Sequence, residues 1–566
     1  MSAFFHDAAA ALVVDGEIVA AAQEERFSRR KHDPRLPLGA VGYCLAEGGL
    51  RISDIDVIAF YEEPILQAER VIATVAATPR PADPAIKLCR ARALLERPRS
   101  LASALAFDGP CALVQHHVAH AASAFCVSGW ERAAFLIVDG VGEWATTTLG
   151  IADSTGLRPI EQVDYPHSLG LFYAAITAHL GFRANEDEYK VMGLAPYGRP
   201  TYVEALRRLL RVHDDGGFSL DVDHLPAPLD NPDAEDRRLE QLLGVERRRA
   251  LEPIGREHQD LACSAQRLLE EALIGLTRRV ARLTGERRIA IAGGVALNGV
   301  ATYKAFQAGG FDEIVVQPAA GDAGGALGAA LHAWHELGAA GATSRHRGGR
   351  ASFDPLLGPS FSSTDIGAFL RSERIPHEIL DPDALTSRVA AALAEGRLVG
   401  WLQGRMEFGP RALGARSILA DPRKASIRDK LNLRIKMREG FRPFAPIVAE
   451  ERARDYFVLP AGPLPAPLSH MLFVVPVVEA VHAMIPAVVH VDGTARPQIV
   501  ASDRSPRLHA LLHAFERETG VGVLLNTSFN VAGEPIVCSP EDAYRTFCYA
   551  GLDLVVMEDH LVERPP

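Results

Sequence analysis

The spacing of apolar and polar residues predicts a chain in which short strands alternate with helices. Two strands, 8–14 and 17–23, flank Asp15-Gly16, a dipeptide typical of two-residue hairpins. Apolar runs predict further strands at 133–138, 144–151, 288–292, 314–317, 398–402 and 521–525. Helical spacing predicts helices at 38–50, 63–75, 166–179, 258–283, 364–373 and 383–396. The alternation favours an α/β protein.

The composition changes between residues 338 and 361, where Gly, Ala, Ser, Arg and Pro occur without periodicity. Such a stretch is typical of a linker between domains. Since 566 residues are too many for one hydrophobic core, the chain should contain more than one domain. We therefore expect domains at 1–345 and 362–566, joined by a linker at 346–361.

Composition and charge narrow the class of protein. The hydrophobic content of 48% is that of an ordinary globular protein, and neither a signal-like segment nor an apolar run of about 18 residues occurs. Seven cysteines without a CxxC pair fit a reducing compartment and argue against zinc knuckles and disulfides. We expect a cytoplasmic protein without a membrane partner. A net charge of −11 makes nucleic acid an unfavourable partner.

Three imidazoles lie within five positions of the stretch Gln115–Ala124. In a helix, His116 and His120 share one face, and His117 points elsewhere. Such a pair is also common as core or capping residues, so the residues downstream must decide between the two interpretations. Asp139 follows a predicted strand, and Asp322 opens a helix, where an aspartate is usually an N-cap. Two imidazoles with carboxylates suit a first-row divalent ion, Fe²⁺ first, with Mn²⁺ or Zn²⁺ as alternatives.

Glycines follow two of the predicted strands. Gly140 and Gly142 come after Asp139, and Gly293-Gly294 lie between a strand and a helix, with Asn298 close behind. Such turns let backbone N–H groups approach a nucleotide phosphate, although hairpins also contain glycine for other reasons. Lys190 lies in the polar segment 185–198 and could contact phosphate or form a packing salt bridge.

The C-terminal part contains arginines beside Gly-Pro turns and Ser, Thr and Asn donors. Guanidinium groups match oxyanions through paired hydrogen bonds, so this set suits a small, doubly anionic donor. The candidate residues are Arg405, Arg411, Arg416, Arg434, Arg442, Arg496, Asn526, Ser528 and Asn530.

Together these stretches resemble the O-carbamoyltransferases of the nodulation and antibiotic-tailoring family. The matching motifs follow the family's order from residue 5 to about 537. They are Phe5-His6-Asp7, Glu24-Glu25-Arg26-Phe27, Arg30-Lys31-His32, 115–124, Val138-Asp139-Gly140, Met192-Gly193-Leu194-Ala195, 293–298, 409–414, Arg442-Pro443-Phe444 and Asn526-Thr527-Ser528-Phe529-Asn530. Family members begin with a short apolar strand before Phe-His-Asp. Here only residues 1–4 precede it, so either the start lies downstream or the first strand is abbreviated.

The resemblance implies a two-part enzyme. Its N-terminal part would be an actin-like (ASKHA) domain, a duplicated ribonuclease H-like fold that binds a metal and a nucleotide. Its C-terminal part would be a YrdC-like α/β domain that uses Mg-ATP to activate carbamoyl phosphate as carbamoyl-adenylate. The N-terminal site would then carbamoylate a hydroxyl of a small-molecule acceptor, a glycoside or polyketide of secondary metabolism such as antibiotic biosynthesis. The resemblance also allows a homodimer.

His6 and Lys31 are the candidate catalytic residues, because an imidazole near neutral pKa can deprotonate an alcohol and a cation can stabilise an adenylate. Three alternatives remain open at this point. A tRNA threonylcarbamoyl-transfer enzyme shares the HxxxH and glycine signatures, but a chain of charge −11 suits tRNA poorly. A metallohydrolase is disfavoured because HExxH is absent from the sequence. A non-catalytic actin-like module for nucleotides or sugars would leave the C-terminal arginines unexplained.

Overall fold

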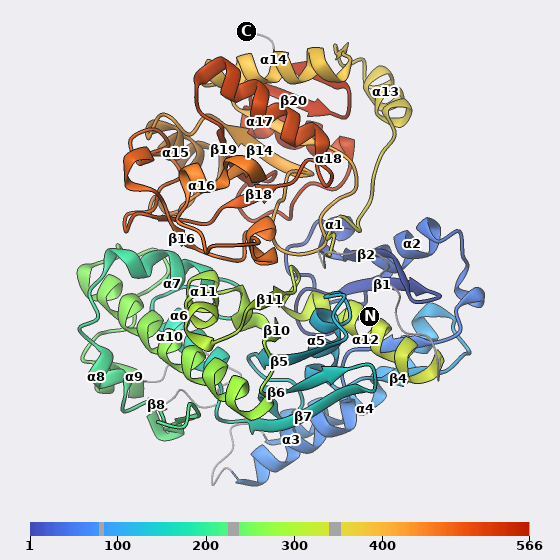
Figure 1. Cartoon of the computed structure of the whole chain (residues 1–566). Coiled ribbons are helices and arrows are strands. Elements are labelled where there is room, and N and C mark those ends of the chain that lie inside the picture. The colour runs from blue at the N-terminus through green and yellow to red at the C-terminus, as the bar shows by residue number, and fades with distance from the viewer. Residues whose placement is uncertain (78–83, 225–236, 339–352, 565–566) are drawn as a thin grey trace. The chain divides into compact units, whose positions relative to one another are not determined.

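The structure is a computed structural model that describes residues 1–77, 84–224, 237–338 and 353–564 (Figure 1). The chain forms two compact units. Unit 1 comprises Met1–Ser28, His32–Val191 and Gly198–Phe353, and unit 2 comprises Arg29–Lys31, Met192–Tyr197 and Asp354–Pro566. The predicted linker, 346–361, lies partly outside the described residues, and the boundary between Phe353 and Asp354 falls within it.

A five-stranded sheet forms the centre of unit 1, in the order β11-β10-β5-β6-β7. Strand β5 (Arg132–Val138) is antiparallel to β6 (Ala145–Asp153), which is antiparallel to β7 (Gly156–Asp164). On its other side β5 is parallel to β10 (Arg288–Ala292), and β10 is parallel to β11 (Glu313–Val316). Numbered along the chain, the order is 3-2-1-4-5 with the second strand reversed, as in a ribonuclease H-like sheet.

The N-terminal region repeats this order. Strands β1 (Ala9–Val14) and β2 (Glu17–Gln23) form the predicted hairpin, and β3 (Ile58–Phe60) is parallel to β4 (Cys111–Leu113). Ser2 pairs with Ala9, while Met1 donates to the Ala59 carbonyl at 2.6 Å and accepts from the Tyr61 N–H at 3.1 Å. Met1 and Ser2 therefore lie between β1 and β3, in the position of the first strand of this order. The repeat agrees with the expected duplication.

Two helices lie between these sheets. Helix α5 (His116–Phe125) packs against β5 and β10, and α12 (Asp322–Gly338) packs against β1 and β3, with α5 and α12 in close contact. Helix α10 (Arg256–Thr284) contacts β5 and β6 and packs on α11 (Gly299–Gly309). The other helices and strands of this part of the chain are α1 (Glu25–Ser28), α2 (Leu38–Glu47), α3 (Pro64–Ala77), α4 (Pro84–Leu105), α6 (Leu169–His179), α7 (Glu188–Leu194), α8 (Val203–Leu206), α9 (Arg238–Leu243), β8 (Leu210–Val212) and β9 (Phe218–Leu220).

Unit 2 is built on an eight-stranded mixed sheet in the order β12-β21-β20-β13-β14-β19-β15-β18. The strands are β12 (Glu378–Ile379), β13 (Val399–Leu402), β14 (Arg416–Ala420), β15 (Ala445–Ala449), β18 (Gln498–Val500), β19 (Val523–Ser528), β20 (Leu554–Met557) and β21 (His560–Glu563). The pairs β13–β20 and β15–β18 are parallel, and the others are antiparallel. A separate pair is formed by β16 (Val475–Pro476) and β17 (Thr494–Ala495).

The core of unit 2 lies where two helices cover this sheet. Helices α14 (Pro382–Ala394) and α17 (Pro506–Thr519) pack on each other, and Leu385, Leu512 and Phe515 are buried with the fully buried Trp401 of β13. The remaining helices are α13 (Ser363–Ser372), α15 (Ser426–Lys430), α16 (Ala453–Tyr456) and α18 (Pro540–Ala550). The expectation of a YrdC-like fold stays a prediction.

Contact between α5 and α12 requires a glycine. A Cβ atom on Gly328 would lie 1.7 Å from the Ala119 carbonyl oxygen, a position that no side chain can occupy. Since these two helices contribute three of the candidate metal ligands, their close approach also sets the geometry of the site.

Gly328→Ala should therefore lower the stability of unit 1 by about 1–3 kcal/mol, as is usual for overpacking. Gly42→Ala in α2 is the control, because its Cβ would meet no atom within 4 Å and alanine is the better helix former. Thermal unfolding of both variants measures the effect. Equal melting temperatures for the two would show that the helices can separate at no cost.

Candidate metal and anion sites

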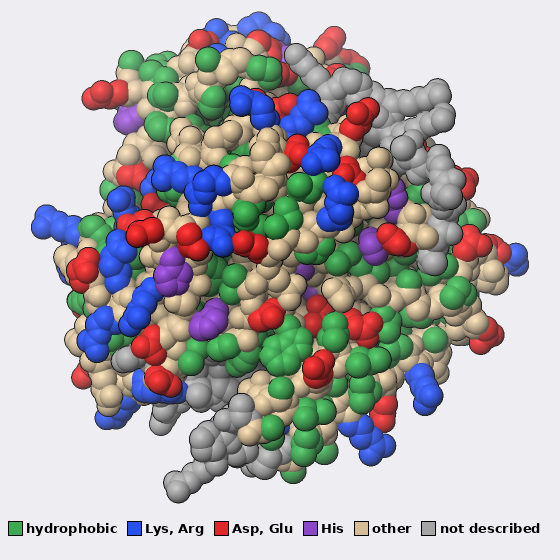
Figure 2. Space-filling view, turned by 60° about the horizontal axis from the view of Figure 1, so that its bottom comes forward, with side chains coloured by type: hydrophobic (Ala, Val, Ile, Leu, Met, Phe, Trp, Pro, Cys, Tyr) green, Lys and Arg blue, Asp and Glu red, His purple; other side chains and the backbone are tan. Residues whose placement is uncertain are grey.

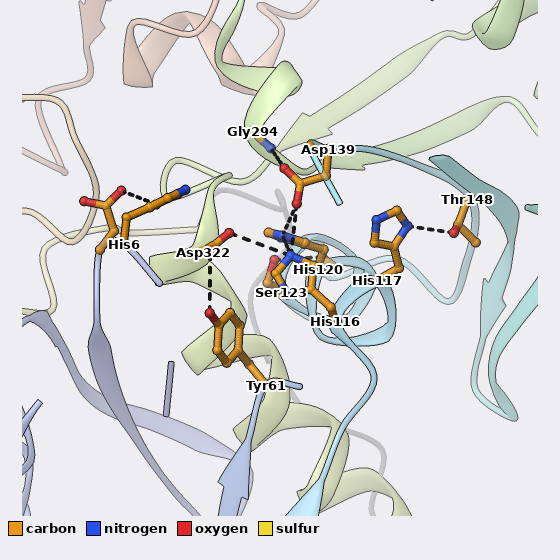
Figure 3. Close-up of polar contacts among 12 residues, drawn as sticks. His6, Tyr61, His116, His117, His120, Ser123, Asp139, Thr148, Gly294 and Asp322 are labelled. Carbon is orange, nitrogen blue, oxygen red and sulfur yellow. Dashed lines mark hydrogen bonds and ion pairs between the residues drawn. The ribbon is translucent and has the colours of Figure 1, made fainter. Parts of the chain in front are cut away.

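Four side chains predicted as metal ligands converge in unit 1 (Figure 3). His116 and His120 lie one turn apart on α5, Asp139 follows β5, and Asp322 begins α12. All four are buried, and one ligand atom from each lies within 4.8 Å of the others. The sequence therefore predicted which residues come together. His116, Asp139 and Asp322 lie where an element begins or ends, and His120 lies one helical turn after His116.

The two imidazoles point at each other and at the carboxylates. Their Nε2 atoms are 3.1 Å apart, and that of His116 is 3.0 Å from Asp139 Oδ2 and 3.7 Å from Asp322 Oδ1. The Nε2 of His120 is 3.6 Å from Asp139 Oδ2. Two imidazole nitrogens at this separation cannot both carry a proton without repulsion. The donor set therefore fits a cation better than it fits a network of neutral hydrogen bonds.

Charge compensation controls the protonation of these residues. Burial lowers the pKa of His116, but the hydrogen bond with Asp139 and the charge of Asp322 outweigh it and raise the pKa to about 10. Burial raises the pKa of Asp139, but hydrogen bonds with His116 and His120 hold it well below its usual value. Without a metal, a proton on His116 thus offsets part of the buried negative charge.

Backbone groups fix the orientation of this cluster. The Gly294 N–H donates to Asp139 Oδ1 at 2.8 Å, and the His116 N–H donates to Glu143 Oε1 at 3.0 Å. Gly293 has φ +94°, and a Cβ there would lie 2.3 Å from the Val138 carbonyl oxygen. The glycine pair is therefore needed to bring the turn against the end of β5, whether or not a phosphate binds there.

His117 does not belong to the cluster, as its helical position predicted. Its Nδ1 lies 2.7 Å from the Thr148 hydroxyl. Burial, followed by the charges of His116 and His120, sets its pKa well below the ordinary value. His117 is thus a neutral residue of the surrounding packing.

The predicted catalytic residue His6 lies in a second polar group. Its Nδ1 is 3.0 Å from Asp7 Oδ2, and the Nδ1 of His32 is 2.8 Å from Asp7 Oδ1, so one carboxylate holds two imidazoles. Burial opposes protonation of His6, but the charges of Asp322 and Asp7 raise its pKa to about 10. Metal-free His6 is therefore an imidazolium at neutral pH and cannot act as a base. Asp7 and His32 were missed as site residues, although both lie in the quoted motifs.

The structure gives other roles to some predicted nucleotide contacts. Asn298 caps α11 by accepting from the Ala301 N–H at 3.1 Å, and its amide donates to Gln266 at 2.9 Å. Lys190 forms an ion pair with Asp187 at 3.1 Å, the alternative that the sequence left open. Beside Gly140 there is space, since a Cβ there would meet no atom within 4 Å, whereas at Gly142 it would meet His116 at 2.9 Å. Their nucleotide contacts stay predictions.

Unit 2 contains a cluster of cations around Arg496. Burial lowers the pKa of its guanidinium, and the positive charges of Arg411, Arg438 and Arg442 lower it further. A guanidinium nevertheless stays protonated in proteins. The lowered pKa therefore means that burial and the neighbouring positive charges destabilise this cation, and a bound anion would stabilise it. We call Arg411, Arg438, Arg442 and Arg496 the arginine cluster. Arg438 was not among the predicted residues, although it lies between two of them, Arg434 and Arg442.

Lys436 lies between Arg434 and Arg438 in the sequence, and its side chain contacts the predicted Ser528 and Asn530. Its buried ammonium lies 2.6 Å from the Ser528 carbonyl and 2.6 Å from Asn530 Oδ1. Burial, with the charges of Arg438 and Arg442 and that of Lys31, lowers its pKa well below the ordinary value. Lys31 is thus an exposed residue of unit 2 whose charge adds to this positive potential. The catalytic role predicted for Lys31 beside His6 stays a prediction.

Arg416 corrects the sequence-based set. It is fully buried and donates to the carbonyls of Pro359, Gln403, Gly404, Ala415 and Cys538 at 2.8–3.2 Å. With its guanidinium engaged by backbone, it is not an anion ligand. Arg405 also donates to a carbonyl, that of Leu357 at 2.7 Å, and Arg434 is exposed. The buried Asn526 amide donates to the Ala412 carbonyl at 2.9 Å.

The chain belongs to the carbamoyltransferase family. Residues 1–331 match the family model of the carbamoyltransferase N-terminus, and residues 390–564 match that of the C-terminus. The protein is therefore a transferase enzyme of this family. Among the described residues, no helix has the length and apolar character needed to cross a bilayer.

Relatives extend over most of the chain. Nodulation protein NolNO of Sinorhizobium fredii is 40% identical over 99% of this chain and 79% of its own length. An uncharacterised protein of Synechocystis is 42% identical over 100% of this chain and 96% of its own length. The 3'-hydroxymethylcephem-O-carbamoyltransferase of Streptomyces clavuligerus is 37% identical over half of each chain. The family resemblance inferred from the motifs is confirmed.

Solved structures are more distant. The (R)-2-hydroxyglutaryl-CoA dehydratase component A of Acidaminococcus fermentans is 14% identical, covers 59% of this chain and 96% of that chain, and gives a TM-score of 0.32. That score is too low to indicate a shared fold.

Metal binding to the four-residue cluster should release protons. Metal-free His116, with a pKa of about 10, is protonated at neutral pH, whereas a ligating imidazole must be neutral. Apparent affinity for a divalent ion should therefore rise about tenfold per pH unit below pH 10 for each proton released. Calorimetric titrations in buffers of different ionisation enthalpy count these protons. His117→Gln is the matched control, and binding heats that are independent of the buffer would contradict the assignment.

Proposed function

We propose that this enzyme is an ATP-dependent O-carbamoyltransferase in which unit 2 activates carbamoyl phosphate as carbamoyl-AMP and unit 1 transfers the carbamoyl group to a hydroxyl. The observation that carries the proposal is that each unit has its own polar site with a different chemistry. Unit 1 has the four-residue cluster of imidazoles and carboxylates, and unit 2 has the arginine cluster.

The arginine cluster supports activation in unit 2. Carbamoyl phosphate carries a doubly charged phosphoryl group and ATP adds a triphosphate, so both substrates bring negative charge that would stabilise the Arg496 cation. Lys436, which contacts Ser528 and Asn530, adds hydrogen-bonding groups to this part of unit 2. We infer that Mg-ATP and carbamoyl phosphate bind here, with Arg411, Arg442 and Arg496 on their phosphates.

The four-residue cluster supports transfer in unit 1. His116, His120, Asp139 and Asp322 would hold a divalent metal, with Fe²⁺ favoured and Mn²⁺ or Zn²⁺ as alternatives. A metal ion in this position supplies a Lewis acid that polarises the carbamoyl carbonyl and neutralises phosphate oxygens. Tyr61 steadies the site, since its hydroxyl donates to Asp322 at 3.4 Å.

His6 is the proposed general base toward the acceptor hydroxyl. Asp7 accepts from its Nδ1, which leaves Nε2 to take the proton. The charge of Asp322 raises the pKa of His6. If a bound metal neutralised that charge, the pKa of His6 would fall, and the neutral imidazole could then accept a proton. The loaded site and the base would thus become active together.

The acceptor is proposed to be a small hydroxylated molecule, a glycoside or polyketide. The nodulation and cephem relatives support this class through their names alone. On the face drawn in Figure 2, acidic and basic side chains are intermingled, an arrangement that does not favour a nucleic acid partner there. A homodimer and a cytoplasmic location remain part of the proposal.

The two half-reactions should separate by mutation. Asp322→Ala should still convert ATP, carbamoyl phosphate and water into carbamoyl-AMP, pyrophosphate and inorganic phosphate, because the change lies in unit 1. It should no longer carbamoylate an acceptor. Pyrophosphate release and mass gain of hydroxylated glycosides measure the two steps. Loss of both half-reactions in a folded variant would contradict the division between the units.

Arg496→Met should weaken the binding of carbamoyl phosphate. A charge-assisted hydrogen bond contributes about 1.5–3 kcal/mol, so the KM for carbamoyl phosphate should rise roughly 10–150-fold. Arg371→Met, at an exposed position on α13 of unit 2, is the charge-matched control. The proposal for the arginine cluster fails if both variants have the wild-type KM.

A further inference from the structure

We propose that unit 2 contains a second divalent-metal site, a surface Zn²⁺ site formed by Glu451, His509 and His513. It is independent of the proposed carbamoyl transfer and of the four-residue cluster in unit 1. The two imidazoles lie one turn apart on α17, and Glu451 lies in the short helix Glu450–Arg452 that follows β15.

The three ligand atoms already converge. The Nε2 atoms of His509 and His513 lie 2.9 and 2.7 Å from the same oxygen, Glu451 Oε1. Ligands around a tetrahedral zinc at about 2.1 Å lie roughly 3.3 Å apart, so insertion of the ion requires an opening of only about half an ångström. All three side chains are at least partly exposed, which allows that adjustment and leaves a coordination position for water.

A further carboxylate supports the outer nitrogen of one ligand. Glu516 Oε2 lies 3.7 Å from His513 Nδ1, and Glu516 is itself held by Arg452 at 2.9 Å. At this distance the two groups make no hydrogen bond, so Glu516 contributes negative charge beside the outer nitrogen of His513.

The local charge also favours a cation. Glu451 contacts both histidines, Glu516 lies 3.7 Å from His513, and Arg452 is the basic group paired with Glu516. Two imidazoles and one carboxylate with an open position form the donor set that Zn²⁺ accepts in proteins.

The amphipathic character of α17 explains what such an ion would do. Leu508, Leu512 and Phe515 anchor the helix in the core of unit 2, while His509 and His513 lie outside that core. A metal shared with Glu451 would join the outer face of α17 to the chain that leaves β15. Because the bound metal would require all three side chains in their folded positions, it would bind the folded state and not the unfolded state, and would thereby stabilise unit 2.

Zinc binding to the full-length, metal-free protein tests the proposal. Equilibrium dialysis should find about one Zn²⁺ fewer per chain in the variant carrying His509→Ala and His513→Ala than in the wild type. Zn²⁺ should also raise the melting temperature of the wild type more than that of the variant. His213→Ala, which removes an exposed histidine of unit 1, is the matched control and should bind as the wild type does.

Glu451→Gln provides a second measurement that preserves side-chain volume. It should weaken binding at this site about tenfold or more, since even groups behind the ligands change metal affinity 10–100-fold. Variants that bind as many zinc ions as the wild type, with equal affinity and equal thermal shift, would overturn the proposal. If the double variant does not fold, the result for Glu451→Gln decides alone.

Discussion

The structure of unit 1 depends on compensating two carboxylates that are buried beside two imidazoles. Asp139 and Asp322 would be costly to ionise in this position without a positive partner. In the metal-free protein a proton supplies it, which is why the pKa of His116 rises. The charges of Asp322 and Asp139 also raise the pKa of His6. The protonation of the proposed base therefore depends on the charge of the metal ligands.

Much of this arrangement could be predicted from the sequence. Apolar runs located the strands beside Asp139 and Gly293, because buried strands leave clear patterns, whereas the helix of His116 and His120 was only assumed in order to place the two imidazoles on one face. The edge strand β7 was missed because its residues are mostly exposed and its apolar pattern is weak. The His–Asp cluster was predictable because His116 and His120 are one helical turn apart, and because Asp139 and Asp322 lie at the end of a strand and the start of a helix.

Side-chain roles in unit 2 were less predictable, because an arginine has the same appearance in a sequence whatever it binds. Arg416 and Arg496 both lie in polar stretches beside turns. One is saturated by carbonyls, and the other faces further guanidinium groups. Only the three-dimensional arrangement of the backbone distinguishes them. The buried position of Lys436 could likewise not be predicted from the sequence, because its partner Ser528 lies about ninety positions away along the chain.

Unit 2 takes two short pieces from the first half of the chain, Arg29–Lys31 and Met192–Tyr197. Arg29 donates to the carbonyls of Pro535 and Ile536 at 3.0 and 2.7 Å, and Gly193 packs near Pro443. The two units are therefore discontinuous in the gene. A fragment expressed from residue 354 onward would lack part of its own structure, so dividing this enzyme into separately produced halves calls for grafting those segments rather than for a single cut.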